Sequence, residues 1–136
     1  MLDPLSIPPV DDDEVVCRFA FSRSEVSENR VHWSAFKIRE RDKGFSVMRQ
    51  READEADLIR EGQKVGDLRN KSLIGWADLL AANILALDLE LHPRLEHDNP
   101  NHADVLGYPD KKESRDKLAM KLADTAIRPV IVRGNS

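Results

Sequence analysis

The chain has few of the features that cross-link small proteins or anchor them in membranes. Its 136 residues include one cysteine, Cys17, so no internal disulfide can form and a zinc site built from cysteines is excluded. The most apolar stretch, residues 79–91, contains Asn83 and Asp88 and is too short to cross a bilayer. No charged segment followed by an apolar one opens the chain. We therefore expect a cytoplasmic protein that makes no contact with a membrane.

Signatures of common enzymes and cofactor sites are also missing. Bulky residues separate Gly62 from Gly66, and neither Gly-Lys-Ser nor Gly-Lys-Thr follows, so the sequence contains no phosphate-binding loop. The Gly-x-Ser-x-Gly elbow of many serine hydrolases is absent. Only 5% of the residues are aromatic, which leaves few rings for stacking single-stranded nucleic acid. We expect no cofactor and leave open whether the protein is an enzyme.

Charge is distributed unevenly along the chain. Residues 1–14 contain acidic residues and three prolines but no basic residue, and we expect an acidic, flexible tail there. The stretch from 15 to 60 is rich in arginine and lysine, so the tail can lie back on it electrostatically. A nucleic-acid-binding surface is one interpretation of these basic residues, and a solvated sheet face is the simpler one. We place a single domain at 15–128 and a C-terminal tail at 129–136.

Hydrophobic alternation predicts strands in the first third of the chain. Residues 15–21 place apolar side chains on one side, as in a half-buried strand, and Cys17 then falls on the inward side as a core residue. Residues 31–38 alternate again with β-branched and aromatic residues, and residues 45–49 form a third short segment. These three segments predict a small antiparallel meander.

The middle of the chain mixes short elements. Residues 52–61 predict a helix that ends at Gly62, because a glycine in the left-handed conformation often closes a helix. Residues 73–80 are compatible with a strand and residues 81–87 with a short helix, while residues 89–92 run extended into a proline. The stretch 73–91 therefore reads as strand, helix or both.

The terminal helix is the clearest pattern. Apolar residues recur at helical spacing from 118 to 127. Asp110 stands where an N-cap residue belongs, Glu113 follows as in a capping box, and Pro129 ends the helix. With the expected sheet, this amphipathic helix and the short central one predict an α+β fold.

Three histidines recur every five residues, with acidic residues between them. They are His92, His97 and His102, and imidazole with carboxylate suits zinc or manganese. A spacing of five is not a helical repeat, and Pro93 and Pro100 interrupt any regular element. We therefore interpret them as solvated loop histidines and expect no metal site.

The stretch 99–109, NPNHADVLGYP, contains the most distinctive histidine. Asn99 and Pro100 favour a turn, His102 follows it, and the chain then continues through Tyr108 toward the terminal helix. A helix start offers free N–H groups, so an anion or a partner's carboxylate can bind beside His102. The alternative is that His102 caps the turn by bonding to the local backbone.

This stretch, preceded by residues 77–91, resembles a group of small, functionally uncharacterised bacterial proteins. They share a His-Ala-x-(Ile or Val)-x-Gly-(Trp or Tyr)-Pro stretch before a terminal helix, and residues 45–49 are similar to their central strand. The resemblance covers residues 18–126 and includes His102 but neither of the other two histidines. It implies a bacterial source and no particular activity, and we associate the group with defence or toxin-antitoxin genes.

Two functional hypotheses follow. In the first, the chain is a non-enzymatic binding or accessory module that contacts a protein or nucleic-acid partner through a basic sheet face and the His102 turn, and a homo-oligomer is compatible with it. In the second, it is a small hydrolase or transferase acting on a nucleotide or RNA, with His102 as acid or base and Arg49 or Arg18 holding a phosphate. The candidate binding residues are His102, Tyr108, Arg49 and Arg18. Whether Arg49 and His102 share a cleft distinguishes the hypotheses.

Overall fold

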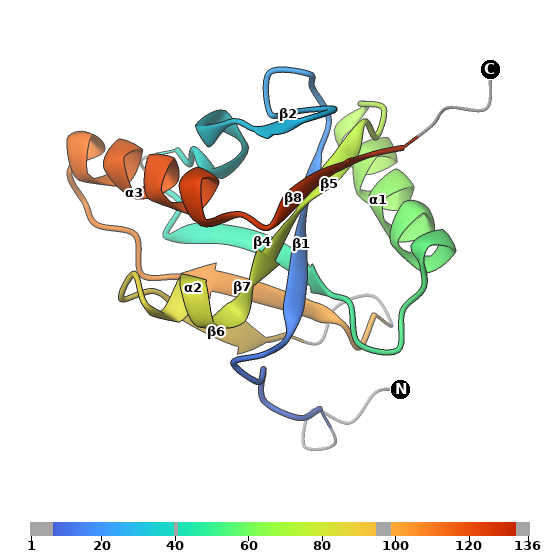
Figure 1. The fold of residues 1–136 in the computed structure, drawn as a ribbon, viewed down its shortest axis with the longest axis horizontal. Helices are drawn as coiled ribbons and strands as arrows, with labels where there is room; N and C mark the ends of the chain where they lie inside the picture. Colours follow the sequence, from blue (N-terminus) through green and yellow to red (C-terminus); the bar gives the residue numbers. More distant parts are fainter. Residues whose placement is uncertain (1–6, 40, 95–98, 133–136) are drawn as a thin grey trace.

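The computed structural model describes residues 7–39, 41–94 and 99–132. A six-stranded antiparallel sheet forms its centre, and the mixed α+β class expected from the sequence is confirmed (Figure 1). The strands follow the spatial order β6-β7-β4-β1-β5-β8. Their bounds are β1 Val15–Ala20, β4 Gly44–Arg49, β5 Gly75–Leu80, β6 Glu90–Pro93, β7 His102–Leu106 and β8 Arg128–Ile131.

Both faces of the sheet are covered, which gives the molecule three layers. Helix α1 (Glu55–Arg69) packs on one face, and α3 (Lys112–Thr125) lies on the other (Figure 1). The α3 side also carries the short helix α2 (Ala81–Leu85), the 3-10 helix η2 (Trp33–Phe36) and a two-stranded ribbon of β2 (Val26–Ser27) and β3 (Arg30–Val31). None of the helices described is long and apolar enough to span a membrane.

Strand β1 shows why the sequence alternates. Val16 and Ala20 point into the larger core on the α3 side, while Cys17 points into a smaller core against α1. Cys17 is fully buried, so its predicted place in the core is confirmed. The predicted strands at 15–21, 45–49 and 73–80 all exist within a few residues, and so do the short helix after Leu80 and the extended segment before Pro93.

The predicted strand at 31–38 is wrong, and with it the meander. Only Arg30–Val31 is a strand, in the separate ribbon, and the chain then turns into η2, which buries Ala35 and Phe36. A short apolar run has the same composition in either conformation, so its period alone does not identify a strand. In the sheet, β1 pairs with β4 on one side and β5 on the other.

Helix α1 does not end at Gly62. It begins at a capping box formed by Asp54 and Asp57, continues past Gly66, and ends at Asn70, whose φ of 56° is left-handed. Both glycines are buried because other parts of the chain approach them closely. A Cβ atom on Gly62 would lie 2.8 Å from a Leu73 methyl carbon. These glycines therefore permit close packing instead of closing the helix.

The C-terminal region differs from its prediction at both ends of the helix. Helix α3 begins after Lys111, which makes no side-chain capping bond, and Asp110 forms an exposed ion pair with Lys43 at 3.2 Å instead of capping. Pro129 does not end the helix but lies within β8, where it is paired with Ala77 of β5. The expected tail at 129–136 is thus a strand over residues 129–131, and residues 133–136 are outside the described part.

Candidate functional site

The site begins where two central strands part. Strands β1 and β4 pair only through Val16 with Arg49 and Cys17 with Met48. Beyond that point β1 remains paired with β5 as far as Ala20, while β4 remains paired with β7. The ladder between β1 and β4 is therefore two residue pairs long, and the later part of β1 has no backbone partner on the β4 side.

The side chain of Arg18 occupies the place where the ladder stops. Its Nη1 donates to the Ser46 carbonyl at 3.1 Å and its Nε donates to the Ala35 carbonyl at 3.3 Å. The guanidinium also lies 5.0 Å from the centroid of the Phe45 ring. No carboxylate of the described residues forms an ion pair with it. Burial, and next the charge of Arg69, lower the pKa of Arg18 to about 10, so it stays cationic at neutral pH.

A cleft of about 480 Å³ lies between the parted strands and the second half of α1. This volume is in the range typical of small-molecule sites. Arg18 and His102 both line the cleft, together with polar residues of α1. Its apolar lining comes from Phe19, Phe21, Val47, Met48, Val65 and Leu68. Leu68 is 82% exposed, so a large apolar side chain stands free at the mouth.

His102 reaches the cleft from the first residue of β7, opposite Met48 of β4. Its side chain is 18% exposed, and its Nε2 lies 3.3 Å from Asp104 Oδ1. Asp104 also accepts from Ser46 Oγ at 3.2 Å and pairs with Arg94 at 3.1 Å. The imidazole is thus held beside a carboxylate that two further groups orient.

The structure separates His102 from the start of the terminal helix. The whole of β7 lies between them, and at the helix start the Arg115 side chain donates to the Asp110 carbonyl. An anion site at that helix start would therefore not include His102. The turn that precedes His102 is closed by Asn99, whose side chain accepts from the Asn101 N–H at 2.9 Å.

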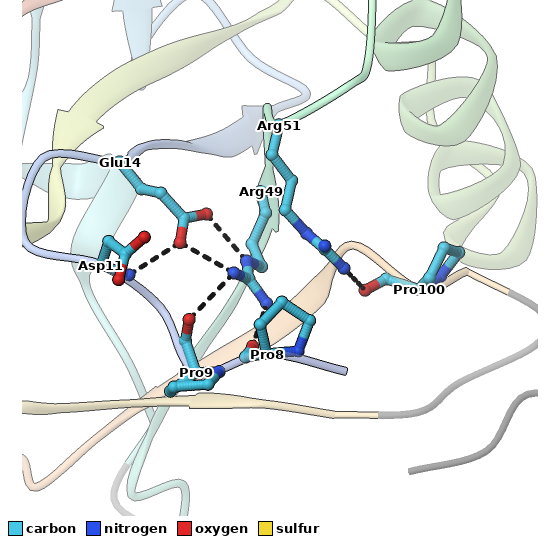
Figure 2. A network of polar contacts seen from close by, with 7 residues as sticks. All are labelled: Pro8, Pro9, Asp11, Glu14, Arg49, Arg51 and Pro100. Atoms are coloured by element: carbon cyan, nitrogen blue, oxygen red, sulfur yellow. Dashed lines mark hydrogen bonds and ion pairs between the residues drawn. The ribbon is translucent and has the colours of Figure 1, made fainter. Parts of the chain in front are cut away.

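Arg49 has a different role from the one considered in the sequence. It is 1% exposed, and its guanidinium faces residues 8–14 (Figure 2). Nε and Nη2 donate to the two Glu14 carboxylate oxygens at 2.8 and 2.7 Å. Nη1 and Nη2 donate to the carbonyls of Pro8 and Pro9 at 2.7 and 3.2 Å. We call Arg49, Glu14, Pro8 and Pro9 the N-terminal clamp.

Residues 8–14 lie back on the basic stretch at Arg49, as the charge pattern predicted, and the clamp holds them through two backbone carbonyls as well as through charge. Glu14 also accepts from the Asp11 backbone N–H at 2.7 Å (Figure 2). Burial raises the pKa of Glu14, but the Arg49 and Asp11 hydrogen bonds outweigh burial and leave it below its ordinary value. Arg51, next to the clamp, donates to the Pro100 carbonyl at 3.1 Å (Figure 2).

The structure thus divides the four candidate residues. Arg18 and His102 line one cleft, whereas Arg49 binds the N-terminal segment and does not line that cleft. Tyr108 is 5% exposed, donates to the Phe36 carbonyl at 2.7 Å, and lies edge-on to Phe45 in the core. Burial raises the pKa of Tyr108 above its usual range, as expected of an enclosed phenol.

Sequence reasoning missed the part of the cleft contributed by α1. Because the helix was expected to stop at Gly62, Val65, Leu68 and Arg69 were not assigned to any element. The spacing of Val65, Leu68 and Arg69 on one helical side is a signal that becomes visible only when the helix is extended past both glycines.

The histidine series does not converge within the described residues. His92 lies in the edge strand β6, where its Nε2 is 2.9 Å from Glu90, and His97 lies outside the described part of the chain. Among the described residues no group of three or more histidine, cysteine or acidic side chains is arranged to hold a metal ion.

Comparison of the chain with family models, with curated proteins and with solved structures found no match. The resemblance of residues 18–126 to small bacterial proteins therefore stays a prediction.

Proposed function

We propose that this protein is a non-enzymatic binding module and that its ligand enters the cleft beside Arg18 and His102. The single observation that carries this is a largely apolar cleft of about 480 Å³ with a cationic side chain inside it. The sequence suggested a protein or nucleic-acid partner. The size of the cleft favours a small organic molecule with an apolar body.

The energetics of the free protein support an occupant. Leu68 is exposed at the mouth, and covering a leucine side chain stabilises a complex by about 1.5 kcal/mol or more. Inside the cleft, Arg18 has two carbonyl partners and an aromatic ring but no ion pair with a described carboxylate. A partly buried cation without an ion-pair partner favours ligands that bring negative charge or an acceptor.

The test uses 1-naphthol as an apolar probe of suitable size. Full-length protein is titrated with it, and the backbone amide shifts of Phe19, Met48 and Leu68 are followed by two-dimensional NMR. We expect saturable changes at these residues. Leu68→Glu should weaken binding without unfolding the protein, because that side chain is already in solvent. Met120→Glu is the matched control, since Met120 is exposed on α3, away from the cleft.

Absence of saturable shifts at the cleft would contradict the proposal. Equal weakening by the Leu68 and Met120 variants would also contradict it, because it would show that the probe adheres to exposed apolar surface generally.

A second candidate function is a hydrolase or transferase acting on a nucleotide or RNA. The observation that favours it is that His102, held by Asp104, lines the same cleft as Arg18. An acid-base histidine oriented by a carboxylate and an arginine for a phosphate are two of the required parts. Against it, the Nη1 and Nε donors of Arg18 are already bonded to the Ser46 and Ala35 carbonyls, which leaves few of its N–H groups to hold a phosphate.

Turnover assays distinguish the two functions. Nucleoside triphosphates and a short single-stranded RNA are incubated with the wild type, with His102→Ala and with His92→Ala. Turnover that disappears only in His102→Ala would favour the enzyme. No turnover by a protein that still binds 1-naphthol is the result that we expect.

A further inference from the structure

A second hollow adjoins the cleft, and its chemistry is different. Its volume is about 550 Å³, and it shares Arg18, Ser46 and Arg69 with the cleft. Its other lining residues come from the chain after η2, from the start of β4 and from Lys71, which follows α1. Its basic lining residues are Arg18, Lys37, Arg39, Arg69 and Lys71.

Positive charge in this hollow is poorly balanced. Asp42 is the one acidic residue among its described lining residues, and it is already paired with Arg39 at 3.0 Å. The remaining four cations form no ion pair with a described carboxylate. We call the hollow that these four cations line the basic hollow. The four cations are Arg18, Lys37, Arg69 and Lys71. The cleft differs, because Glu61 and Asp67 line it together with its basic residues.

Three cations of the basic hollow are held on aromatic rings. Their distances to the ring centroids are 5.0 Å for Arg18 on Phe45, 5.4 Å for Lys37 on Trp33 and 5.5 Å for Arg69 on Phe21. Lys37 and Arg69 are exposed, so these contacts restrict their side chains only modestly before a ligand arrives, and they reduce the entropy lost on binding by a correspondingly small amount. Like charges gathered in this way repel one another, and the effect of Arg69 on Arg18 is an instance of that repulsion. A bound anion relieves it.

We propose that the basic hollow binds the phosphate group of the ligand whose apolar body occupies the cleft, so that the ligand is an organic phosphate monoester. This inference rests on the proposed function. Four cations suit a doubly charged phosphate better than a single carboxylate. Arg18 lines both cavities and is therefore positioned at the junction between the apolar body and the phosphate.

The test separates the two halves of such a ligand. Isothermal titration calorimetry on the full chain compares 1-naphthyl phosphate, 1-naphthol, 1-naphthoate and inorganic phosphate. We expect 1-naphthyl phosphate to bind at least about tenfold more tightly than 1-naphthol or phosphate alone, since linking two groups makes the second contact intramolecular. We also expect it to bind more tightly than 1-naphthoate, and to weaken as salt is raised.

Variants locate the phosphate. Lys71→Glu should weaken the binding of 1-naphthyl phosphate by about tenfold or more, because a charge-assisted contact is replaced by repulsion. The affinity for 1-naphthol should be unchanged. Lys71 is exposed and forms no ion pair with a described residue, so the substitution leaves the fold intact. Lys121→Glu, an exposed lysine of α3, is the matched control and should change neither ligand.

The outcomes separate this inference from the proposed function. Two results would overturn the phosphate site and leave the cleft proposal standing, provided that 1-naphthol binds. In the first, 1-naphthyl phosphate binds no more tightly than 1-naphthol. In the second, the Lys71 and Lys121 variants change its affinity equally. If 1-naphthoate binds as tightly as 1-naphthyl phosphate, the hollow selects a single negative charge and the phosphate assignment is overturned. If 1-naphthol fails to bind, the proposed function itself fails, and this inference fails with it.

Discussion

The Nη1 atom of Arg18 donates to the backbone carbonyl oxygen of Ser46 at 3.1 Å, at the place where strands β1 and β4 would otherwise continue to pair. The Arg18 guanidinium thus takes the place of a backbone N–H as the donor to the Ser46 carbonyl. Ser46 keeps a hydrogen bond for its carbonyl, as a partly buried peptide group requires. Beyond this point β1 and β4 are not paired with each other, and the cleft lies between them.

Loss of the buried arginine in the N-terminal clamp should destabilise the fold strongly. Arg49→Ala would leave the Glu14 carboxylate without its counter-charge and two proline carbonyls without their donors. Breaking a buried pair in this way costs about 3 kcal/mol. Chemical denaturation measures the change. The control is Arg39→Ala, whose ion pair with Asp42 is largely exposed and therefore contributes little to stability. Similar losses in both variants would contradict the clamp.

Acid should weaken the clamp. The folded-state pKa of Glu14 lies below its ordinary value of 4.5, so folding favours the charged form. The resulting stabilisation is complete above that ordinary value and is lost as the pH falls through the folded pKa. Urea denaturation of the wild type and Glu14→Gln at about pH 7 and about pH 3 should show a stability difference that narrows in acid. A constant difference would mean that Glu14 titrates normally in the folded protein.

Gly66→Ala should destabilise the protein although alanine is the better helix former. A Cβ atom at position 66 would lie 2.6 Å from the Lys71 backbone oxygen, and that backbone is fixed by its own hydrogen bond from Lys71 N to Gly66 O. Overpacking against a fixed backbone costs about 1–3 kcal/mol, more than the gain in helix propensity of about 1 kcal/mol. Thermal unfolding compares it with Gln63→Ala on the exposed side of α1, which should stay within about 0.5 kcal/mol of the wild type. A stabilised Gly66→Ala would show that the end of α1 adjusts freely.

The two helix starts should respond differently to loss of their aspartates. Asp54 accepts from the Asp57 N–H at 2.8 Å, so Asp54→Ala should cost about 1 kcal/mol. Asp110 is 92% exposed in its side chain and makes only an ion pair with Lys43, so Asp110→Ala should change stability by no more than about 0.5 kcal/mol. Melting temperatures measured side by side are sufficient. A larger loss of stability in Asp110→Ala than in Asp54→Ala would show that Asp110 caps α3.

Local patterns predicted much of the secondary structure because they depend on neighbours in sequence. Strands β1, β4 and β5 are short runs of mostly apolar residues, and α3 has apolar residues at helical spacing. The order of strands was beyond such reasoning, since β1 lies between two segments that follow it by about thirty and sixty residues. Gly62 was misread for a related reason. Its meaning comes from Leu73 and Phe19, which contact it only in the folded chain.

The candidate site also combines residues that local sequence identifies with residues that only the folded chain brings together. Arg18 and His102 were candidates by residue type and local context, and the fold brings them to one cleft. Arg49 was a candidate for the same reasons, but its role in the fold is set by an ion pair with Glu14, which lies far away in sequence. No local pattern distinguishes Lys71 or Leu68, because the cavities that they line form only in the folded chain, where β1 and β4 part.

The edge position of β8 has a consequence for incomplete chains. Strand β5 is buried along most of its length and is apolar except for Asp78, and its outer side is covered by Arg128–Ile131. Pro129 lacks a backbone N–H, and a proline in an edge strand discourages further strands from adding there. A chain truncated before Arg128 would present β5 itself as an open, largely apolar edge and would leave Asp78 without its ion pair to Arg128. We therefore expect proteolytic trimming of these few residues to favour aggregation through added strands, even though it removes little of the hydrophobic core.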